Sequence, residues 1–523
     1  MPLSLARHAR GAAALSLIAA LAACGGGGGG GGGTTTPPPV NGSGDQPLAD
    51  PVAYSAAPGA SLASAAESAA ISHHQVSVGG QALAYVATTG HLTASDPSSQ
   101  AAVASIFYVA YTSAGTNRPV TFVLSGGPGD NQGGLHIGSF APRRVVTNEP
   151  SLTEPSAPSL VDNPDTLLDK TDLVFLDEPG TGLSEAIAPN TNLSLRGVDP
   201  DIAVYRDFIL RWLTVNQRTA SPTFVLGHSY GTARAAMLAN LLQPLGVNLR
   251  GVTLISPILD FSHNCDTYAA VHVTGSCAAS LPTFAAIAAF QGKVAAPADL
   301  DAFLQSARDY DDATYAPALA ASLAAPATPD AGVTAQLAAF TGIPASTWSS
   351  DFGMTNVDFR TQLVPGSILG RTDARVVVPT SSPLAADGSD PAETLLDSAF
   401  GNAFTQYLGG ELGYTNGSAY TSLDISFSTW PPTHGGQQVP DFIPDLAAAI
   451  ARNPQLPVLA MAANYDLATP FHQTELDLAR LAAGAKVTLK HYAAGHDIYL
   501  DNAARPLMKA DLAAFYDQAA ASN

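Results

Sequence analysis

The chain has 523 residues, of which 46% are hydrophobic and only 13% are charged, and its formal net charge at pH 7 is −20. This length exceeds one ordinary domain and fits a large core that carries an insertion. An acidic surface repels polyanions, and no basic stripe is interleaved with aromatic residues, so composition and charge argue against DNA or RNA as partners.

The first 24 residues are typical of a bacterial lipoprotein signal peptide. Arg7 and Arg10 precede an apolar run at 12–23, which is too short to span a bilayer permanently, and the run ends in the lipobox-like sequence Leu-Ala-Ala-Cys. We expect cleavage to leave a diacylated Cys24 on an exported envelope protein; the alternative is a plain secretory signal cut nearby. Residues 25–50, rich in Gly, Thr and Pro, are expected to form a tether.

The three cysteines agree with export. If Cys24 is lipidated, Cys265 and Cys277 remain as one pair, and a secreted context permits a disulfide between them. Such a bond would close a short loop and contribute about 3 kcal/mol in the chain-entropy model. The alternative is two free thiols. A metal site at these cysteines is disfavoured, because no nearby His or Cys has ligand spacing.

From about residue 75, apolar runs alternate with stretches of helical character. Several runs are nearly continuous and bounded by turn residues, as strands buried on both faces should be. The alternation predicts an α/β fold with a doubly wound, mostly parallel sheet. The expected strands are 81–87, 106–111, 120–124, 172–177, 223–226, 251–255, 457–462 and 486–492, and the expected helices among them are 202–215, 231–242 and 474–481.

The region 261–454 has a different pattern, rich in Ala, Leu and Phe at helical spacing, for example at 281–290 and 298–307. We interpret it as a mostly helical cap insertion over the carboxyl ends of the strands. It separates a first part of the core, residues 75–260, from a second part, residues 455–523.

The pentapeptide Gly227-His228-Ser229-Tyr230-Gly231 lies between an expected strand and an expected helix. A Gly-X-Ser-X-Gly segment in this context is typical of a strained strand-to-helix turn, in which side chains two residues either side of the serine would clash. We therefore predict Ser229 as the nucleophile; the alternative is a structural turn. The backbone N–H of Tyr230 would point toward the helix N-terminus, where it can stabilise an oxyanion.

A serine hydroxyl needs a base, and the base needs an acid that orients it. In this fold the chain order is serine, acid, histidine. His496 combines a late position, a loop after an expected strand and a preceding glycine, while His491 within that strand is the lesser rival. Asp466, the predicted acid, lies in the loop that follows the expected strand 457–462. Asp497 and Asp501 are alternatives with poorer geometry, because they are so close to the histidine in sequence.

A second oxyanion donor is expected in a loop after an early strand. The expected strand 120–124 leads into Ser125-Gly126-Gly127-Pro128-Gly129-Asp130. Glycines there let backbone N–H groups approach a substrate oxygen closely. Gly127 is the candidate donor, and a simple turn is the alternative.

These segments, in this order, resemble the serine carboxypeptidase family in its bacterial form. The resemblance covers roughly 104–519 and implies an α/β-hydrolase core with a helical cap, which removes residues from peptide C-termini. The segments that carry it are the glycine loop at 126–129, the strand and Pro-Gly-Thr-Gly loop at 173–184, the acid loop at 464–470, the histidine loop at 494–496, and weaker echoes at 280–283 and 366–371.

Two residues depart from the family's pattern. Ser125 stands where the glycine loop usually begins with Asn, and His228 stands where Glu usually precedes the nucleophile. In the family these side chains help to bind the substrate's terminal carboxylate, so the resemblance implies a substrate-binding role for Ser125, Gly126 and His228. Ser125 can still donate an O–H and His228 an N–H. The carboxylate site is thus altered rather than lost.

The expected reaction is serine-type hydrolysis of C-terminal peptide bonds through an acyl-enzyme, with a peptide as substrate and no metal or organic cofactor. The membrane is expected to be contacted only through the lipid at Cys24. Gly-His-Ser-X-Gly is also common in esterases and proline-type aminopeptidases of this fold, so an esterase, an acyltransferase or such an aminopeptidase stays open. A non-catalytic surface-binding lipoprotein is the alternative from another class. Side-chain preference, pH optimum and oligomeric state are not specified by the sequence.

Overall fold

The computed structural model describes residues 44–64, 66–115, 117–149, 159–265, 276–423 and 429–521. The chain divides into two compact units, residues 1–35 and 36–523, and every described residue belongs to the second. The predicted lipidation site Cys24 lies outside the described residues and stays a prediction. Within the described ranges, no helix is long and apolar enough to cross a membrane.

A ten-stranded sheet forms the centre of the molecule, with the order β16-β15-β11-β10-β5-β8-β4-β3-β2 and β9 paired to β4. The strands from β16 to β8 are parallel, and β4, β3 and β2 are antiparallel. The predicted mostly parallel sheet is confirmed. Its strands are β2 (Ser68–Val78), β3 (Gln81–Ser95), β4 (Ala102–Ser113), β5 (Val120–Leu124), β8 (Asp172–Leu176), β9 (Glu185–Ala186), β10 (Thr223–His228), β11 (Leu249–Ile255), β15 (Val458–Ala463) and β16 (Val487–Tyr492).

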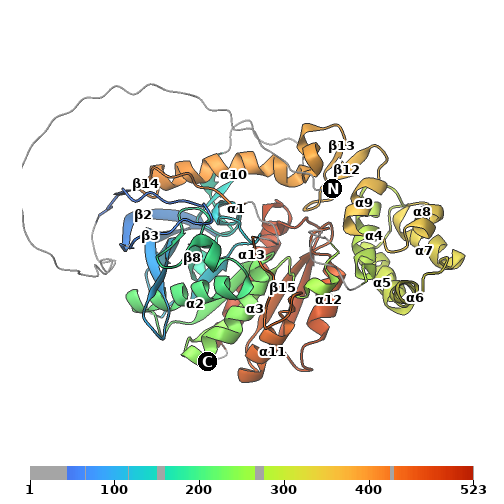
Figure 1. Ribbon diagram of the computed structural model, residues 1–523. Helices are drawn as coiled ribbons and strands as arrows, with labels where there is room; N and C mark the ends of the chain where they lie inside the picture. The colour runs from blue at the N-terminus through green and yellow to red at the C-terminus, as the bar shows by residue number, and fades with distance from the viewer. Residues whose placement is uncertain are drawn as a thin grey trace, which may run out of the picture. The chain divides into compact units, whose positions relative to one another are not determined.

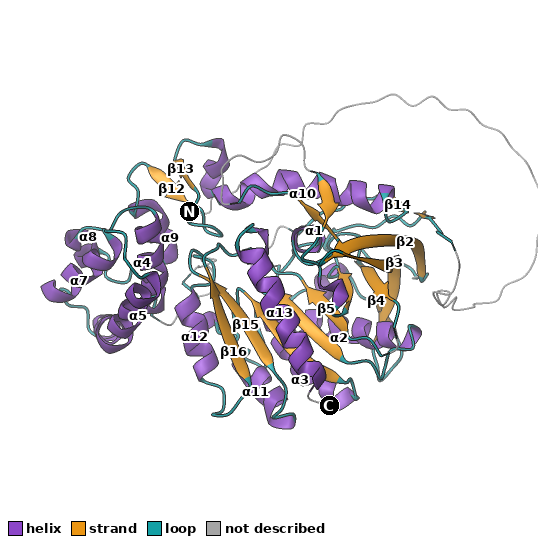
Figure 2. Cartoon of the chain, turned by 180° about the vertical axis from the view of Figure 1, so that it is seen from behind, coloured by secondary structure: helices purple, strands orange, loops and turns teal. Residues whose placement is uncertain are grey.

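Helices cover both faces of this sheet, because its central strands are apolar on both sides. On one face lie α2 (Val198–Val215), α3 (Gly231–Leu242) and α11 (Ile443–Arg452) (Figure 1). The other face is covered by α13 (Ala504–Ala521) (Figure 2). Strands β5 and β10 are buried along their whole length, which places the ends of both strands firmly between the two helical layers.

A separate helical cluster lies beside α12 (Phe471–Ala479) in both views, and its apolar core also includes Leu467 and Phe471 (Figures 1 and 2). Next along the chain, α10 (Pro391–Gly410) leads toward β14 (Tyr414–Asn416), which pairs with β1 (Leu48–Asp50). The elements of the cluster are α4 (Leu281–Phe290), α5 (Leu300–Tyr310), the π-helical turn η6 (Asp311–Tyr315), α6 (Ala316–Ala324), α7 (Ala331–Thr341), α8 (Ala345–Ser350) and α9 (Asn356–Gln362).

The segment expected as a cap, 261–454, therefore has two kinds of structure. Helices α4–α9 form the separate cluster, which we call the cap. The last helix of the segment, α11, packs instead on α3 of the core, where Asn240 Nδ2 donates to Asp445 Oδ1 at 2.7 Å. Three short pieces complete the fold: α1 (Gly133–Gly138), the pair β6 (Arg143–Val145) and β7 (Leu160–Asp162), and the pair β12 (Ser367–Leu369) and β13 (Val377–Pro379).

Candidate active site

Ser229 occupies a sharp turn between β10 and α3. Its φ of +55° lies in the left-handed region, which costs a non-glycine residue free energy and is common at functional sites. A Cβ at Gly227 would lie 1.9 Å from the Gly231 carbonyl oxygen, and one at Gly231 would lie 2.3 Å from the Leu124 oxygen. Only glycine fits at both positions. The turn leaves Ser229 partly exposed while its neighbours His228 and Tyr230 are buried.

The acid and the histidine lie in the loops that follow β15 and β16. His496 Nδ1 is 2.7 Å from Asp466 Oδ2. Asp466 is fully buried and also accepts hydrogen bonds from the backbone N–H groups of Ala468 at 2.7 Å and Thr469 at 2.9 Å, and from Thr469 Oγ1 at 2.6 Å. These donors stabilise the negative charge of the Asp466 carboxylate and fix its orientation toward the His496 imidazole.

The pKa of each member of this pair is shifted in the direction that favours its charged form. Burial by itself raises the pKa of Asp466, but the His496 charge and hydrogen bond outweigh it and the pKa is lowered. Burial likewise lowers the pKa of His496, and the Asp466 charge and hydrogen bond reverse this, so that its pKa is raised. The pair therefore stabilises the imidazolium that forms when the histidine takes a proton.

The alternatives weighed from the sequence have other partners. Asp501 Oδ2 is 2.8 Å from Arg375 Nη1. His491 lies within β16, and its Nε2 is 2.8 Å from Glu475 Oε1. Asp497 faces a different histidine, described below. Only Asp466 reaches His496 Nδ1 at hydrogen-bonding distance among the described acidic residues.

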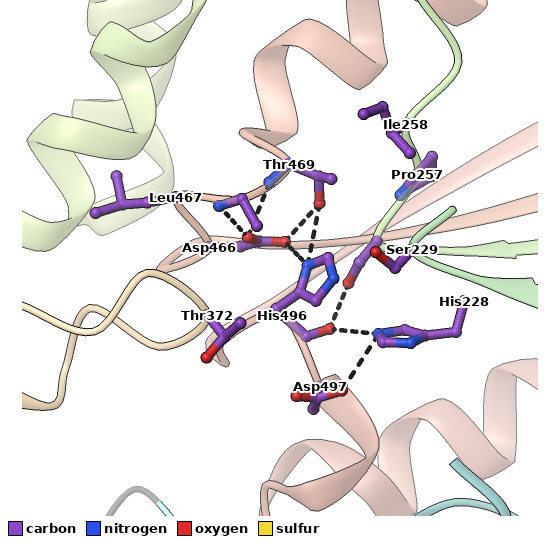
Figure 3. A network of polar contacts seen from close by, with 12 residues as sticks. His228, Ser229, Pro257, Ile258, Thr372, Asp466, Leu467, Thr469, His496 and Asp497 are labelled. Carbon is purple, nitrogen blue, oxygen red and sulfur yellow. Dashed lines mark hydrogen bonds and ion pairs between the residues drawn. The ribbon is translucent and has the colours of Figure 1, made fainter. Parts of the chain in front are cut away.

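Ser229 lies on the side of the His496 ring away from Asp466 (Figure 3). No hydrogen bond joins the Ser229 hydroxyl to His496 within the described part of the chain. Such bonds are often long without substrate and tighten in the complex. Ser229, the imidazole of His496 and the carboxylate of Asp466 thus follow one another in this order, as a serine hydrolase triad would require.

The glycine loop packs directly against the nucleophile. A Cβ at Gly126 would lie 2.9 Å from Ser229 Cβ, and Gly127 has a φ of +96°. The backbone N–H groups of Gly127 and Tyr230 have no protein acceptor among the described residues. Two free N–H groups beside the serine are the elements of an oxyanion hole.

One side chain that the sequence reasoning missed holds this loop. Arg234, on the first turns of α3, is fully buried, and its Nη1 donates to the carbonyl oxygens of Ser125 at 2.8 Å and Gly126 at 3.3 Å. Its Nε donates to Asp201 at 2.7 Å, and its Nη2 pairs with Glu178. Burial lowers the pKa of Arg234 to about 9, which leaves it charged at neutral pH. By fixing these carbonyls, Arg234 orients the amides of the glycine loop. The available signal was a lone basic residue in an otherwise apolar helix.

His228 and Ser125, the candidate substrate-binding side chains, both contact protein groups. His228 Nε2 lies 3.4 Å from the His496 carbonyl oxygen and 3.4 Å from Asp497 Oδ1 (Figure 3). Its ring packs edge-on against Tyr499. Burial lowers the pKa of His228 to about 4, so it is neutral near pH 7. Ser125 Oγ donates to the Asp130 carbonyl oxygen at 3.2 Å. Gly126, the third candidate, packs on Ser229.

The connection between β12 and β13 also reaches the site. The carbonyl oxygen of Thr372 accepts from His496 N–H at 2.6 Å, and that of Arg371 accepts from Leu467 N–H at 3.0 Å. One loop of the inserted segment thus fixes both the histidine loop and the acid loop. Its sequence signal was the weak family echo at 366–371.

Cys265 and Cys277 form a disulfide with a Cα–Cα distance of 5.5 Å. The bond closes the loop that leads from the core into α4. The expected pairing is therefore present in the structure, and the alternative of two free thiols is not.

The family model of the serine carboxypeptidases matches residues 80–292. This confirms the predicted resemblance over a segment that contains the glycine loop and Ser229 and ends before Asp466 and His496. The chain is a serine hydrolase.

The likeness to one solved structure, that of Kex1, agrees with the α/β-hydrolase fold of this chain. Kex1, a prohormone-processing carboxypeptidase from Saccharomyces cerevisiae, aligns with a TM-score of 0.50 and 12% identity, covering 83% of this chain and 91% of its own. The proline iminopeptidase of Mycobacterium smegmatis aligns with a TM-score of 0.35 and 13% identity, covering 86% of this chain and 100% of its own. No curated protein matches the sequence.

Proposed function

We propose that this serine hydrolase is a serine-type carboxypeptidase that cleaves C-terminal peptide bonds through an acyl-enzyme. The observation that carries the proposal is the match to serine carboxypeptidases over residues 80–292, the segment that contains both the glycine loop and the Ser229 turn. The 2.7 Å contact between His496 and Asp466 supports a charge-stabilised base for that serine.

In the proposed mechanism, His496 removes the Ser229 proton as the hydroxyl oxygen attacks the last peptide carbonyl. The oxyanion of the tetrahedral intermediate accepts hydrogen bonds from the N–H groups of Gly127 and Tyr230. His496 then protonates the leaving amine, the C–N bond breaks, and the peptide stays esterified to Ser229. A water, deprotonated by the same imidazole, releases it as a carboxylic acid. Asp466 stays ionised throughout.

Recognition of the substrate's terminal carboxylate would fall to Ser125 and His228. The neutral His228 ring has one N–H, which faces the His496 carbonyl and Asp497 at 3.4 Å. These distances are long for hydrogen bonds, so both contacts are weak. A substrate carboxylate that takes the place of the Asp497 carboxylate at Nε2 would gain a shorter bond without leaving a buried donor unpaired.

A matched pair of peptides tests the proposal. One is an N-blocked peptide with a free C-terminal carboxylate, and the other is the same peptide with a C-terminal amide. We expect the enzyme to release the last amino acid from the free acid and to cleave the amide much more slowly, and we expect Ser229→Ala to cleave neither peptide. Mass spectrometry of the products measures the cleavage. The thermal midpoint of Ser229→Ala checks that it is folded. Hydrolysis confined to aryl or acyl esters would contradict the peptidase assignment.

An esterase or acyltransferase is the second candidate, and the observation that favours it is His228. Where carboxypeptidases of this family usually have a protonated Glu, this chain has His228. Burial lowers the pKa of this imidazole to about 4 and keeps it neutral. Cleavage of short acyl esters with no preference between free acids and amides would favour this function. A fluorophosphonate probe separates both from a non-catalytic binding protein, which would not be labelled at Ser229.

We place the enzyme at the bacterial cell envelope, anchored by lipid on Cys24. The disulfide between Cys265 and Cys277 supports export, because such bonds persist in oxidising compartments. The test compares detergent-phase partitioning of the full chain with that of Cys24→Ala expressed in the same host. We expect the full chain in the detergent phase and the variant in the aqueous phase. Equal partitioning of the two would contradict the anchor.

A further inference from the structure

A buried histidine of the core faces two adjacent carboxylates of the cap. His472, on α12, is 3% exposed, and Asp311 and Asp312 begin the π-helical turn η6. His472 Nε2 lies 3.2 Å from Asp312 Oδ1 and 3.8 Å from Asp311 Oδ2. One oxygen of each carboxylate and one nitrogen of the ring lie within 4.8 Å of one another. Single π-turns within helices are frequent at functional sites.

The cluster has more negative groups than donors. Asp311 is 1% exposed, and its Oδ1 has no hydrogen-bond partner among the described residues. The single N–H that His472 could present at Nε2 reaches only Asp312. A buried carboxylate oxygen without a hydrogen-bond partner is costly, and a bound cation would offset that cost.

The other nitrogen of His472 is fixed by a second group of residues. Nδ1 lies 2.6 Å from Glu475 Oε2. Glu475 is itself held by Arg308 Nη2 at 2.8 Å and by His491 Nε2 at 2.8 Å. In a neutral ring that donates Nδ1–H to Glu475, the lone pair is on Nε2, the nitrogen that faces Asp311 and Asp312. This is how metal-binding histidines are oriented in proteins.

We propose that Asp311, Asp312 and His472 form a structural site for a divalent transition-metal ion that links the cap to the core. One imidazole with two carboxylates suits zinc or manganese better than calcium or magnesium, which prefer oxygen ligands alone. Ligands bound at about 2.0–2.2 Å lie roughly 3–3.5 Å from one another, close to the distances from His472 Nε2. Asp312, whose side chain is 54% exposed, provides access and leaves room for a water ligand.

The position of the site gives the ion a role distinct from catalysis. Helix α12 begins directly after the acid loop that carries Asp466, and η6 lies between two cap helices. The ion would tie these elements together and so hold the cap beside the acid loop. Its expected effect is on thermal stability.

His434 serves as a control because, among the described residues, each of its nitrogens faces a single carboxylate, whereas Nε2 of His472 faces two. Its Nδ1 lies 2.6 Å from Asp199 and its Nε2 lies 2.8 Å from Asp445. Each nitrogen has its own carboxylate, and these contacts raise the pKa of His434 to about 9. The ring is an imidazolium with no lone pair for a metal. His434→Gln should therefore leave metal binding unchanged.

The test is zinc titration of the chelator-treated full chain by calorimetry, with thermal midpoints measured with and without Zn²⁺. We expect a site of one ion per chain and a rise in the midpoint. Asp312→Asn and His472→Gln should abolish both, Glu475→Gln should weaken binding by about 10–100-fold, and His434→Gln should behave as the wild type.

Cobalt gives a second measurement that does not depend on stability. Co²⁺ at the site should show a ligand-field absorption that Asp312→Asn lacks, and this variant alters a half-exposed side chain, so it tests the site even if His472→Gln does not fold. The proposal is wrong if the wild-type chain binds neither ion, or if Asp312→Asn binds both as tightly as His434→Gln does.

Discussion

Two buried histidines near Ser229, His496 and His228, have ring centres 4.8 Å apart and pKa values shifted in opposite directions. His496 has a carboxylate at 2.7 Å, and its pKa is raised. His228 has one at 3.4 Å, and burial lowers its pKa to about 4. Burial disfavours the charge on both rings, so the distance and geometry of the carboxylate decide which ring can accept a proton. His496 is therefore suited to act as a base, and His228 is a neutral hydrogen-bond donor.

The largest expected effect on activity is that of replacing Ser229, which lies next to both histidines. Ser229→Ala removes the nucleophile, and we expect kcat to fall by about 10⁶-fold, leaving what the oxyanion hole and binding contribute. Rates on an N-blocked peptide and on an activated ester measure this loss. A residual rate within about 100-fold of wild type would show that another group attacks the substrate.

Asp466→Asn tests the raised pKa of His496. The change keeps the shape of the side chain and removes its charge, and we expect kcat to fall by about 10⁴-fold. A base works only when it is neutral, so activity is lost as pH falls through its pKa. Because the Asp466 charge raises that pKa, the acid limb of the profile should move to lower pH in the variant. A limb that stays in place would mean that another group sets it.

The sequence was sufficient for the parts of the site that depend on local pattern or on strand ends. The glycines around Ser229 are dictated by a close approach of backbone atoms, and parallel strands bring Asp466 and His496 to the same edge of the sheet. Contacts between distant segments left no such signal. Arg234 has the appearance of one basic residue in an alanine-rich helix until its contact with Ser125 is known.

The same reasoning explains what was missed in the fold and in the cap. Helix α10 lies in the segment expected to be mostly helical, but its bounds were not predicted, and glycines at 401, 409 and 410 lower its helical propensity. The contact of His472 with Asp312 spans 160 residues, and no spacing rule connects them. The hydrogen bond from His496 N–H to Thr372 likewise joins the catalytic loop to an insertion whose position no sequence pattern specifies.

Arg234→Lys tests whether Arg234 holds the glycine loop in place beside Ser229. Lysine keeps the charge but lacks the planar group that reaches Asp201, Glu178 and the Ser125 carbonyl together. We expect kcat to fall by about 100-fold, as for loss of one oxyanion donor, with little change in KM. A purely structural role would lower the thermal midpoint without separating kcat from KM, so both are measured.

His228→Gln has the smallest expected effect and bears most directly on the comparison of the two rings. Glutamine keeps an N–H donor and cannot be charged. Since the pKa of His228 is about 4, this ring carries no charge over the range in which His496 titrates. We therefore expect the acid limb of the kcat profile to stay at the wild-type pH, above the ordinary histidine pKa of about 6.5, and kcat itself to stay within roughly tenfold of the wild-type value.

The same variant tests the binding role of His228. KM for a free-acid peptide should rise relative to KM for an ester if Nε2–H binds the terminal carboxylate. An acid limb that shifts in His228→Gln would mean that the two imidazoles titrate together, and that the neutral state of His228 is part of what sets the base.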